Sequence, residues 1–238
     1  MNKNLFVLSL MTFTFLVFFA GIALAKPNGV STLNEIKSER ASADNATANN
    51  ATAGNVTELT VFGYSTTQSW QGYFGNVTGT IQLADADDNI MYNWSQASPQ
   101  GEIYASTNSS LQWTGVSCYI LSGSNITDLE DSFNINSSAA DGVDETFNRN
   151  DHAEFYTNSI HFTAGQCNNT KVYDNTGTGA FDEVLLTDSA SNIIFASILQ
   201  EDATGFDSNT HDFEMLVLED GHNGDTQITT YYFWVELE

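Results

Sequence analysis

The sequence predicts an all-β protein, a β-sandwich of the jelly-roll or immunoglobulin-like kind that follows a signal peptide and a flexible linker. Three observations lead to this prediction. Short runs of β-branched and aromatic residues recur beyond residue 55, turns rich in Gly, Asn, Asp and Ser separate them, and amphipathic helical periodicity is nearly absent. With 238 residues, 41% of them hydrophobic, the chain is long and apolar enough to bury a core.

The expected strands are short and are spread over the chain. They cover residues 56–64, 74–83, 89–94, 117–121, 183–187, 192–199, 213–219 and 226–237. The last four flank polar turns at 188–191 and 220–225, which predicts two hairpins. The final strand is apolar on both faces, with Phe233 on one face and Trp234 on the other, so we expect it between two layers. Only residues 126–133 fit one or two turns of helix.

Residues 1–25 predict an export signal of the general secretory route. Lys3 gives the positive start, residues 5–19 are mostly apolar, and the small residues Ala23 and Ala25 mark a cleavage site. The alternative is an uncleaved anchor, because residues 5–25 are just long enough to span a bilayer. Either way we expect an extracellular or cell-surface protein. Residues 26–57, rich in Asn, Ala, Thr and Ser, predict the flexible linker, and residues 58–238 the single β-sandwich domain.

The chain is strongly acidic. Its 30 Asp and Glu against six Lys and Arg give a net charge of −24, which excludes binding to nucleic acid backbones. Most carboxylates must therefore be solvated or bind cations. Asp85, Asp87 and Asp88 crowd oxygen ligands into one turn and predict a calcium site, although Ile90 stands where an EF-hand loop needs Gly. The alternative is a solvated turn. Residues 83–92 also parallel residues 186–195, as a duplicated half-domain or as similar hairpin turns.

Cys118 and Cys167 are the only cysteines. In an oxidising compartment they predict an intramolecular disulfide, and two buried free thiols are the alternative. The bridge would close a loop of roughly 50 residues and stabilise the fold by about 4 kcal/mol in the loop-entropy model.

N-glycosylation acceptors are about twice as frequent as chance would give. The nine sites are Asn45, Asn50, Asn55, Asn76, Asn93, Asn108, Asn125, Asn136 and Asn168. Three of them follow one another in the linker and indicate a small glycosylated stalk. The alternative is an Asn- and Thr-rich chain that is not modified.

Two further functions leave weaker signals. Trp94 and Trp113 belong to a group of aromatic residues that would suit stacking on sugar rings, although aromatic residues in such a domain more often anchor the core. No nucleophile elbow, phosphate-binding glycine loop or zinc-protease motif occurs, and the spacing of His152 and His161 supports no catalytic constellation. We therefore expect no enzymatic activity, with a secreted hydrolase as the third hypothesis.

Residues 70–81, 92–94 and 101–106 resemble secreted or cell-surface β-domain proteins of archaea, a group without an assigned activity. The resemblance covers about 40 residues and implies location and fold only. Together the observations predict a secreted, N-glycosylated structural protein of a surface layer, matrix or filament, with calcium as a candidate cofactor. Its partners would be further copies of itself or other cell-surface proteins. The alternative is a carbohydrate-binding or adhesive module with glycans as ligands.

Overall fold

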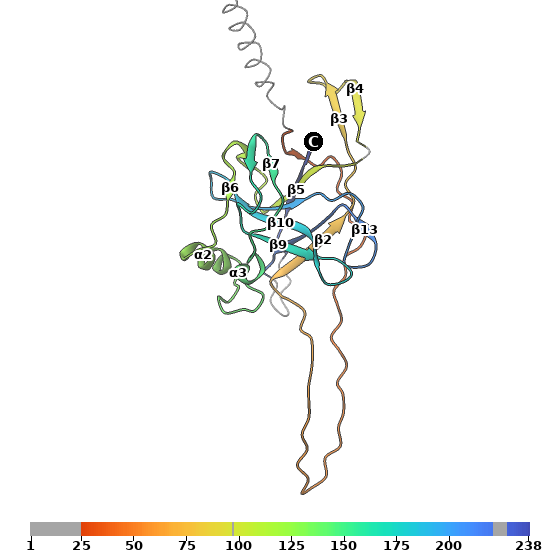
Figure 1. Ribbon diagram of the computed structural model, residues 1–238, viewed down its shortest axis with the longest axis vertical. Coiled ribbons are helices and arrows are strands. Elements are labelled where there is room, and N and C mark those ends of the chain that lie inside the picture. The colour runs from red at the N-terminus through yellow and green to blue at the C-terminus, as the bar shows by residue number, and fades with distance from the viewer. Residues whose placement is uncertain (1–24, 97, 221–227) are drawn as a thin grey trace, which may run out of the picture.

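The computed structural model describes residues 25–96, 98–220 and 228–238, and Figure 1 shows their arrangement. Strands make up 34% of the structure and helices 8%, which confirms the all-β prediction. Nearly all of the expected signal peptide lies outside the described residues, as do most of the turn residues between 220 and 226. In the described ranges, no helix is long and apolar enough to cross a membrane.

Seven antiparallel strands form the main sheet. Their order is β1-β15-β5-β11-β10-β6, and β9 pairs with β10 beside β6. The bounds are β1 (Asn28–Gly29), β15 (Tyr232–Leu237), β5 (Gly101–Ser106), β11 (Ile193–Ile198), β10 (Gly179–Thr187), β6 (Ser117–Cys118) and β9 (Asn169–Tyr173). The expected hairpin around residues 188–191 is confirmed as β10 and β11.

The other strands form four small two-stranded sheets. These are β14 (Phe213–Leu218) with β2 (Trp70–Gly75), β3 (Thr80–Ala84) with β4 (Ile90–Ser95), β7 (Phe155–Thr157) with β8 (Ile160–Phe162), and β12 (Ala203–Thr204) with β13 (Thr210–His211). Three short helical segments complete the described fold: α2 (Ser124–Ser132), where a helix was expected, α3 (Val143–Thr146) and a 3₁₀ turn (Trp113–Gly115).

The middle of the main sheet is buried on both faces. On one face β14 packs against β10 and β11, and the core there contains Leu185, Phe195 and Met215. On the other face Val184 and Leu186 pack with aromatic residues of the β7–β8 hairpin and the 3₁₀ turn. Successive residues of a strand point to opposite faces, so β10 contributes side chains to both cores. This is why its residues 184–186 are all apolar.

The second expected hairpin is wrong. β14 pairs with β2 in a small sheet, whereas β15 pairs with β5 and β1 in the main sheet. The chain therefore passes from one layer to the other between these strands, and a polar turn sequence suits such a crossing as well as a hairpin. β15 contributes Phe233 to one core and Trp234 to the other, as the apolar pattern on both of its faces predicts.

One turn conformation occurs three times. It begins at Asp85, Asp174 and Asp188, and each Oδ1 accepts hydrogen bonds from the main-chain N–H groups two and four residues later. The residue three positions on has a φ of 62°, 78° and 64° respectively. The first and third of these turns account for the similarity between residues 83–92 and 186–195, because an Asp side chain mimics main-chain acceptors in such turns.

The predicted disulfide is confirmed. It joins Cys118, in β6 at one edge of the main sheet, to Cys167 just before β9, with 5.1 Å between their Cα atoms. Cys167 is buried, and its main-chain N–H donates to Nε2 of His152 at 3.0 Å. The bridge thus fastens β6, which contributes only two residues to the main sheet, to the segment that leads into β9.

Candidate functional site

A long extended segment projects from one end of the molecule (Figure 1). We call residues 31–68 the arm. Every residue of the arm is exposed, and none belongs to a helix or strand. Main-chain hydrogen bonds fix it on both sides, from Val30 N–H to the carbonyl of Phe233 at 3.3 Å and from Glu219 N–H to the carbonyl of Ser69 at 2.9 Å. The arm therefore begins and ends on the folded body, and between these ends most of it extends away from the body (Figure 1).

The arm contains the expected strand 56–64, which pairs with no strand in the described ranges of the chain. Five of its nine residues are large and apolar with exposed fractions between 61% and 101%: Val56, Leu59, Val61, Phe62 and Tyr64. The rings of Phe62 and Tyr64 lie 4.9 Å apart and touch only at an edge. A segment with strand-forming residues and no partner in its own fold is a surface available for another strand or sheet.

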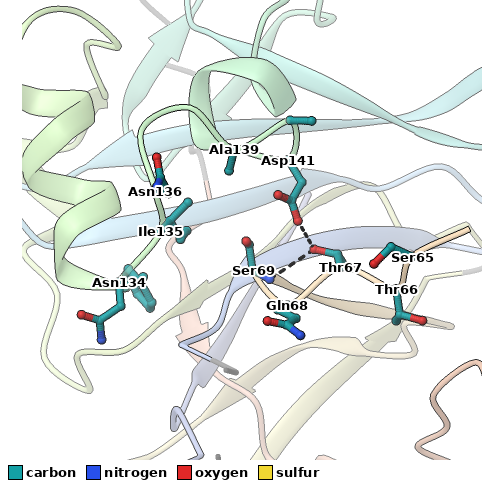
Figure 2. Close-up of a pocket in the computed structure, with 12 residues that line it drawn as sticks. Ser65, Thr66, Thr67, Gln68, Ser69, Asn134, Ile135, Asn136, Ala139 and Asp141 are labelled. Atoms are coloured by element: carbon teal, nitrogen blue, oxygen red, sulfur yellow. Dashed lines mark hydrogen bonds between the residues drawn. The ribbon is translucent and has the colours of Figure 1, made fainter. Parts of the chain in front are cut away.

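The root of the arm borders a groove, shown in Figure 2, of about 610 Å³. Residues 65–69 form one wall, and the loop after α2, including Ile135 and Asp141, forms the other. The Asp141 carboxylate accepts a hydrogen bond from the Thr67 hydroxyl, and its carbonyl accepts one from Nε1 of Trp70 at 2.7 Å. These contacts direct the arm away from the body where it meets β2.

The hairpin formed by β3 and β4 projects at the opposite end of the molecule (Figure 1). All residues of both strands are exposed. Its register pairs Ile81 with Trp94 and Leu83 with Tyr92, so these four side chains share one face. The pair Gln82 and Asn93 lies on the other face. In its paired section the hairpin is thus amphipathic, and the apolar face has exposed fractions of 43–57%. Met91, next to Tyr92 at the bulge, is a further apolar residue and is 81% exposed.

The expected sugar-binding residues have different surroundings. Trp113 is buried in the core between Tyr104 and Trp234, with ring centroids 5.1 and 5.6 Å away, so its faces are not open to a ligand. Trp94 is half exposed and lies 4.6 Å from the Tyr92 ring. Of the two tryptophans, only Trp94 could stack on a sugar.

Most of the expected glycosylation sites lie on the surface. Exposed are Asn45, Asn50, Asn55, Asn76, Asn93, Asn125 and Asn136, whereas Asn108 and Asn168 are half buried. The side-chain amide nitrogen, to which a glycan would be attached, donates to Asn192 in the case of Asn108 and to the carbonyl of Phe147 in the case of Asn168. These two sites are the least accessible of the nine.

The expected calcium residues lie at the tip of the β3–β4 hairpin. The Asp85 carboxylate accepts hydrogen bonds from Asp87 and Asn89, and the hydrogen bond with Asn89 lowers its pKa. Asp87 and Asp88 are exposed. Within the part of the chain that the structure describes, no group of three or more His, Cys, Asp or Glu side chains is arranged to hold a metal ion. Calcium binding stays a prediction.

The histidines in the central part of the chain have structural contacts. His152 is buried, with Nε2 bound to Cys167 N–H and Nδ1 2.6 Å from the carbonyl of Ala153. His161 is exposed, stacks on Tyr156 and lies 3.5 Å from a Glu154 oxygen. Neither residue lines the groove at the root of the arm. Both nitrogens of His152 are engaged, so it is not placed to act as a general base.

Sequence reasoning missed two features of these surfaces. It expected residues 56–64 inside the domain, because their composition does not reveal whether a partner strand exists. It also treated residues 89–94 as one more strand of the body. Apolar and polar residues alternate in both 81–83 and 92–94, on either side of an Asp turn, and this pattern indicates an amphipathic hairpin. Comparisons with protein-family models, curated proteins and solved structures find no match for this chain.

Proposed function

We propose that the protein is a secreted, N-glycosylated structural component of the cell surface that associates with further copies of itself. The observation that carries the proposal is the presence of exposed apolar segments at both ends of the molecule, one on the extended arm and one on the β3–β4 hairpin. Soluble monomers rarely expose such clustered apolar residues without a partner. A β-rich body that is cross-linked by a disulfide suits a structural role outside the cell.

The distribution of sequons supports this proposal. Asn45, Asn50 and Asn55 precede the apolar segment of the arm, and Asn93 lies on the polar face of the hairpin. Glycans at these positions would surround the apolar surfaces without covering them. The acidic body carries 26 acidic and only two basic residues between 69 and 238, so cations would screen or bridge neighbouring copies.

Sedimentation velocity of the purified exported protein tests the proposal. We expect species larger than the monomer, whose fraction grows with protein concentration, and a further increase when calcium replaces chelator. A monomer at all concentrations, with calcium and with chelator, would contradict the structural role. Assembly that is indifferent to calcium would retain the structural role and remove calcium from it.

A second candidate function is carbohydrate binding or adhesion, favoured by the half-exposed Trp94 beside Tyr92. The two rings are inclined by 48°, so a sugar ring would stack on the exposed face of one of them. A glycan-binding screen tests it, with Trp94→Ala as the variant and Trp113→Phe as a control at the buried tryptophan. Binding that survives Trp94→Ala would exclude this surface.

A further inference from the structure

We infer that the copies join head to tail, with residues 56–64 of one copy's arm docked on the apolar face of the β3–β4 hairpin of the next copy. The inference rests on the proposed structural function and specifies its contact. Both surfaces are made of strand-forming residues, and neither has a partner strand among the residues that the structure describes. The occupant of the hairpin would be a second copy of this protein.

The hairpin needs such a partner. A two-stranded antiparallel sheet is marginally stable alone and requires further strands or packing against another element. β3 and β4 pair only with each other within the described ranges. Their shared face presents Trp94 and three other apolar side chains to solvent. The arm segment has apolar side chains of both parities, so in an extended conformation either of its sides could cover this face.

The arm of the same copy is poorly placed to be that partner. Residues 65–69, which connect Tyr64 to β2, span at most about 18 Å when fully extended. β2 is six residues long and itself extends for about 20 Å, and the hairpin starts only after residue 79. The hydrogen bonds of Asp141 with Thr67 and Trp70 also direct the arm away from the hairpin. A second copy has no such constraint.

Charge favours the arm over other parts of the chain for this contact. Glu58 is the only charged residue between 45 and 68, whereas the body is strongly acidic. Two bodies repel each other on close approach. A nearly uncharged segment on a long extension can reach the neighbouring hairpin and keep the two bodies apart.

The two surfaces differ and lie at opposite ends of the long axis (Figure 1). Contacts between different surfaces are heterologous, and they build open chains unless the rotation closes them into a ring. The expected product is therefore a filament, in which each copy uses its arm once and its hairpin once.

Two charge variants and their mixture test this arrangement by sedimentation velocity. Phe62→Asp places a carboxylate in the arm segment, and Trp94→Asp places one in the hairpin face. Both residues are exposed, so circular dichroism and the melting temperature should match the unmodified protein. We expect each variant alone to be monomeric. Their mixture should form dimers and nothing larger, because one variant retains a working hairpin and the other a working arm.

The controls place Asp in the same elements at positions outside the contact. Ala53→Asp lies in the polar part of the arm, and Gln82→Asp on the polar face of the hairpin. Both should assemble like the unmodified protein. If the unmodified protein and Phe62→Asp assemble equally, or if the mixture yields no dimer, the head-to-tail contact is overturned while the structural function stands. A monomeric unmodified protein would overturn both. Glycan binding by Trp94 with unimpaired assembly of Trp94→Asp would also overturn the contact.

Discussion

Glu183 and Ser197 face each other across β10 and β11, and their side chains form hydrogen bonds with main-chain groups of β14 that a neighbouring strand would otherwise bind. Oε2 of Glu183 accepts the Leu216 N–H at 2.8 Å, and the Ser197 hydroxyl donates to the carbonyl of Glu214 at 2.9 Å. A strand edge enclosed in protein must find partners for its main-chain groups. Here the side chains of the facing sheet provide them, which locks β14 over the main sheet.

Glu183→Ala should lower the free energy of unfolding by about 2–4 kcal/mol, because it leaves the Leu216 N–H unpaired and opens a cavity. Ser197→Ala should cost only about 1 kcal/mol, and Glu183→Gln, which keeps an acceptor, should be milder than Glu183→Ala. Urea unfolding measures these differences. Hydrogen exchange gives the specific readout: the Leu216 amide should lose protection in Glu183→Ala beyond the global effect. Unchanged protection of that amide would show that the hydrogen bond does not hold the edge.

A pair of acidic residues is buried on the opposite face of the main sheet. Glu102 and Glu236 are register partners in β5 and β15, and both are almost completely inaccessible to solvent. Burial, followed by repulsion from Glu236, raises the pKa of Glu102 well above its ordinary value. Burial raises the pKa of Glu236 to about 7, even though the Asn158 N–H and the Tyr104 hydroxyl donate to it.

This pair should make the fold less stable as the pH rises. A carboxyl group whose pKa is higher in the folded state binds more protons there, so its stabilisation is complete below the unfolded value of 4.5 and is lost as the pH passes about 7. The free energy of unfolding should therefore fall between pH 4.5 and pH 8. Hydrogen bonds lower the pKa of Asp174 and Asp207 to about 2, so the stabilisation of the fold by these two carboxylates is lost only below pH 4.

Glu236→Gln should reduce the decrease, because it removes one of the buried carboxyl groups whose pKa is raised in the folded state, while Glu102 and Glu183 remain. It should raise the free energy of unfolding at pH 8 by about 1–2 kcal/mol, less than the full pKa shift would give because the group is partly screened. Denaturant unfolding at pH 5 and pH 8 measures the effect. The exposed Glu145 provides the matched control, and Glu145→Gln should retain the pH dependence of the unmodified protein. An identical slope in Glu236→Gln would assign the pH dependence to other groups.

Reduction of the Cys118–Cys167 bridge should destabilise the body without unfolding all of it at room temperature. The sequence separation is 49 residues, and the loop-entropy model gives about 4 kcal/mol for a loop of that size. Scanning calorimetry with and without reductant should show a clear fall in the melting temperature, and Cys118→Ser with Cys167→Ser should match the reduced protein. A melting temperature indifferent to reductant would mean that packing around β6 and β9 suffices.

The sequence allowed the all-β class, the disulfide, α2 and the β10–β11 hairpin to be predicted, because each has a local signal. Alternating apolar residues around an Asp turn identify a hairpin, and two cysteines allow only one pairing. The pairing of β15 with β5, and of β14 with β2, joins segments far apart in the chain. No local pattern records which strands meet across such distances.

The candidate surfaces were harder to predict for a related reason. Residues 56–64 and the strands of the body share the same composition, and only the absence of a partner distinguishes them. Buried acids gave no signal either. Glu102 lies two residues before Tyr104, on the same face of β5. This face is buried because β15 pairs with β5 and the β7–β8 hairpin contacts it. Burial of a carboxyl group depends on tertiary packing, which composition does not encode.

The repeated Asp turn offers a comparison within one molecule. Asp188 is buried, and its Oδ2 also accepts hydrogen bonds from the Gln112 N–H and the Asn192 side chain. Asp85 makes the same turn on the exposed β3–β4 hairpin. Asp188→Ala should therefore cost about 2–3 kcal/mol, since four hydrogen bonds to one buried, charged acceptor are lost, whereas Asp85→Ala should leave the global free energy of unfolding unchanged. Urea unfolding of the two variants measures this difference. Equal losses would mean that the β3–β4 hairpin unfolds together with the body, so the hairpin would then be an integral part of the core fold and not a separate element awaiting a partner.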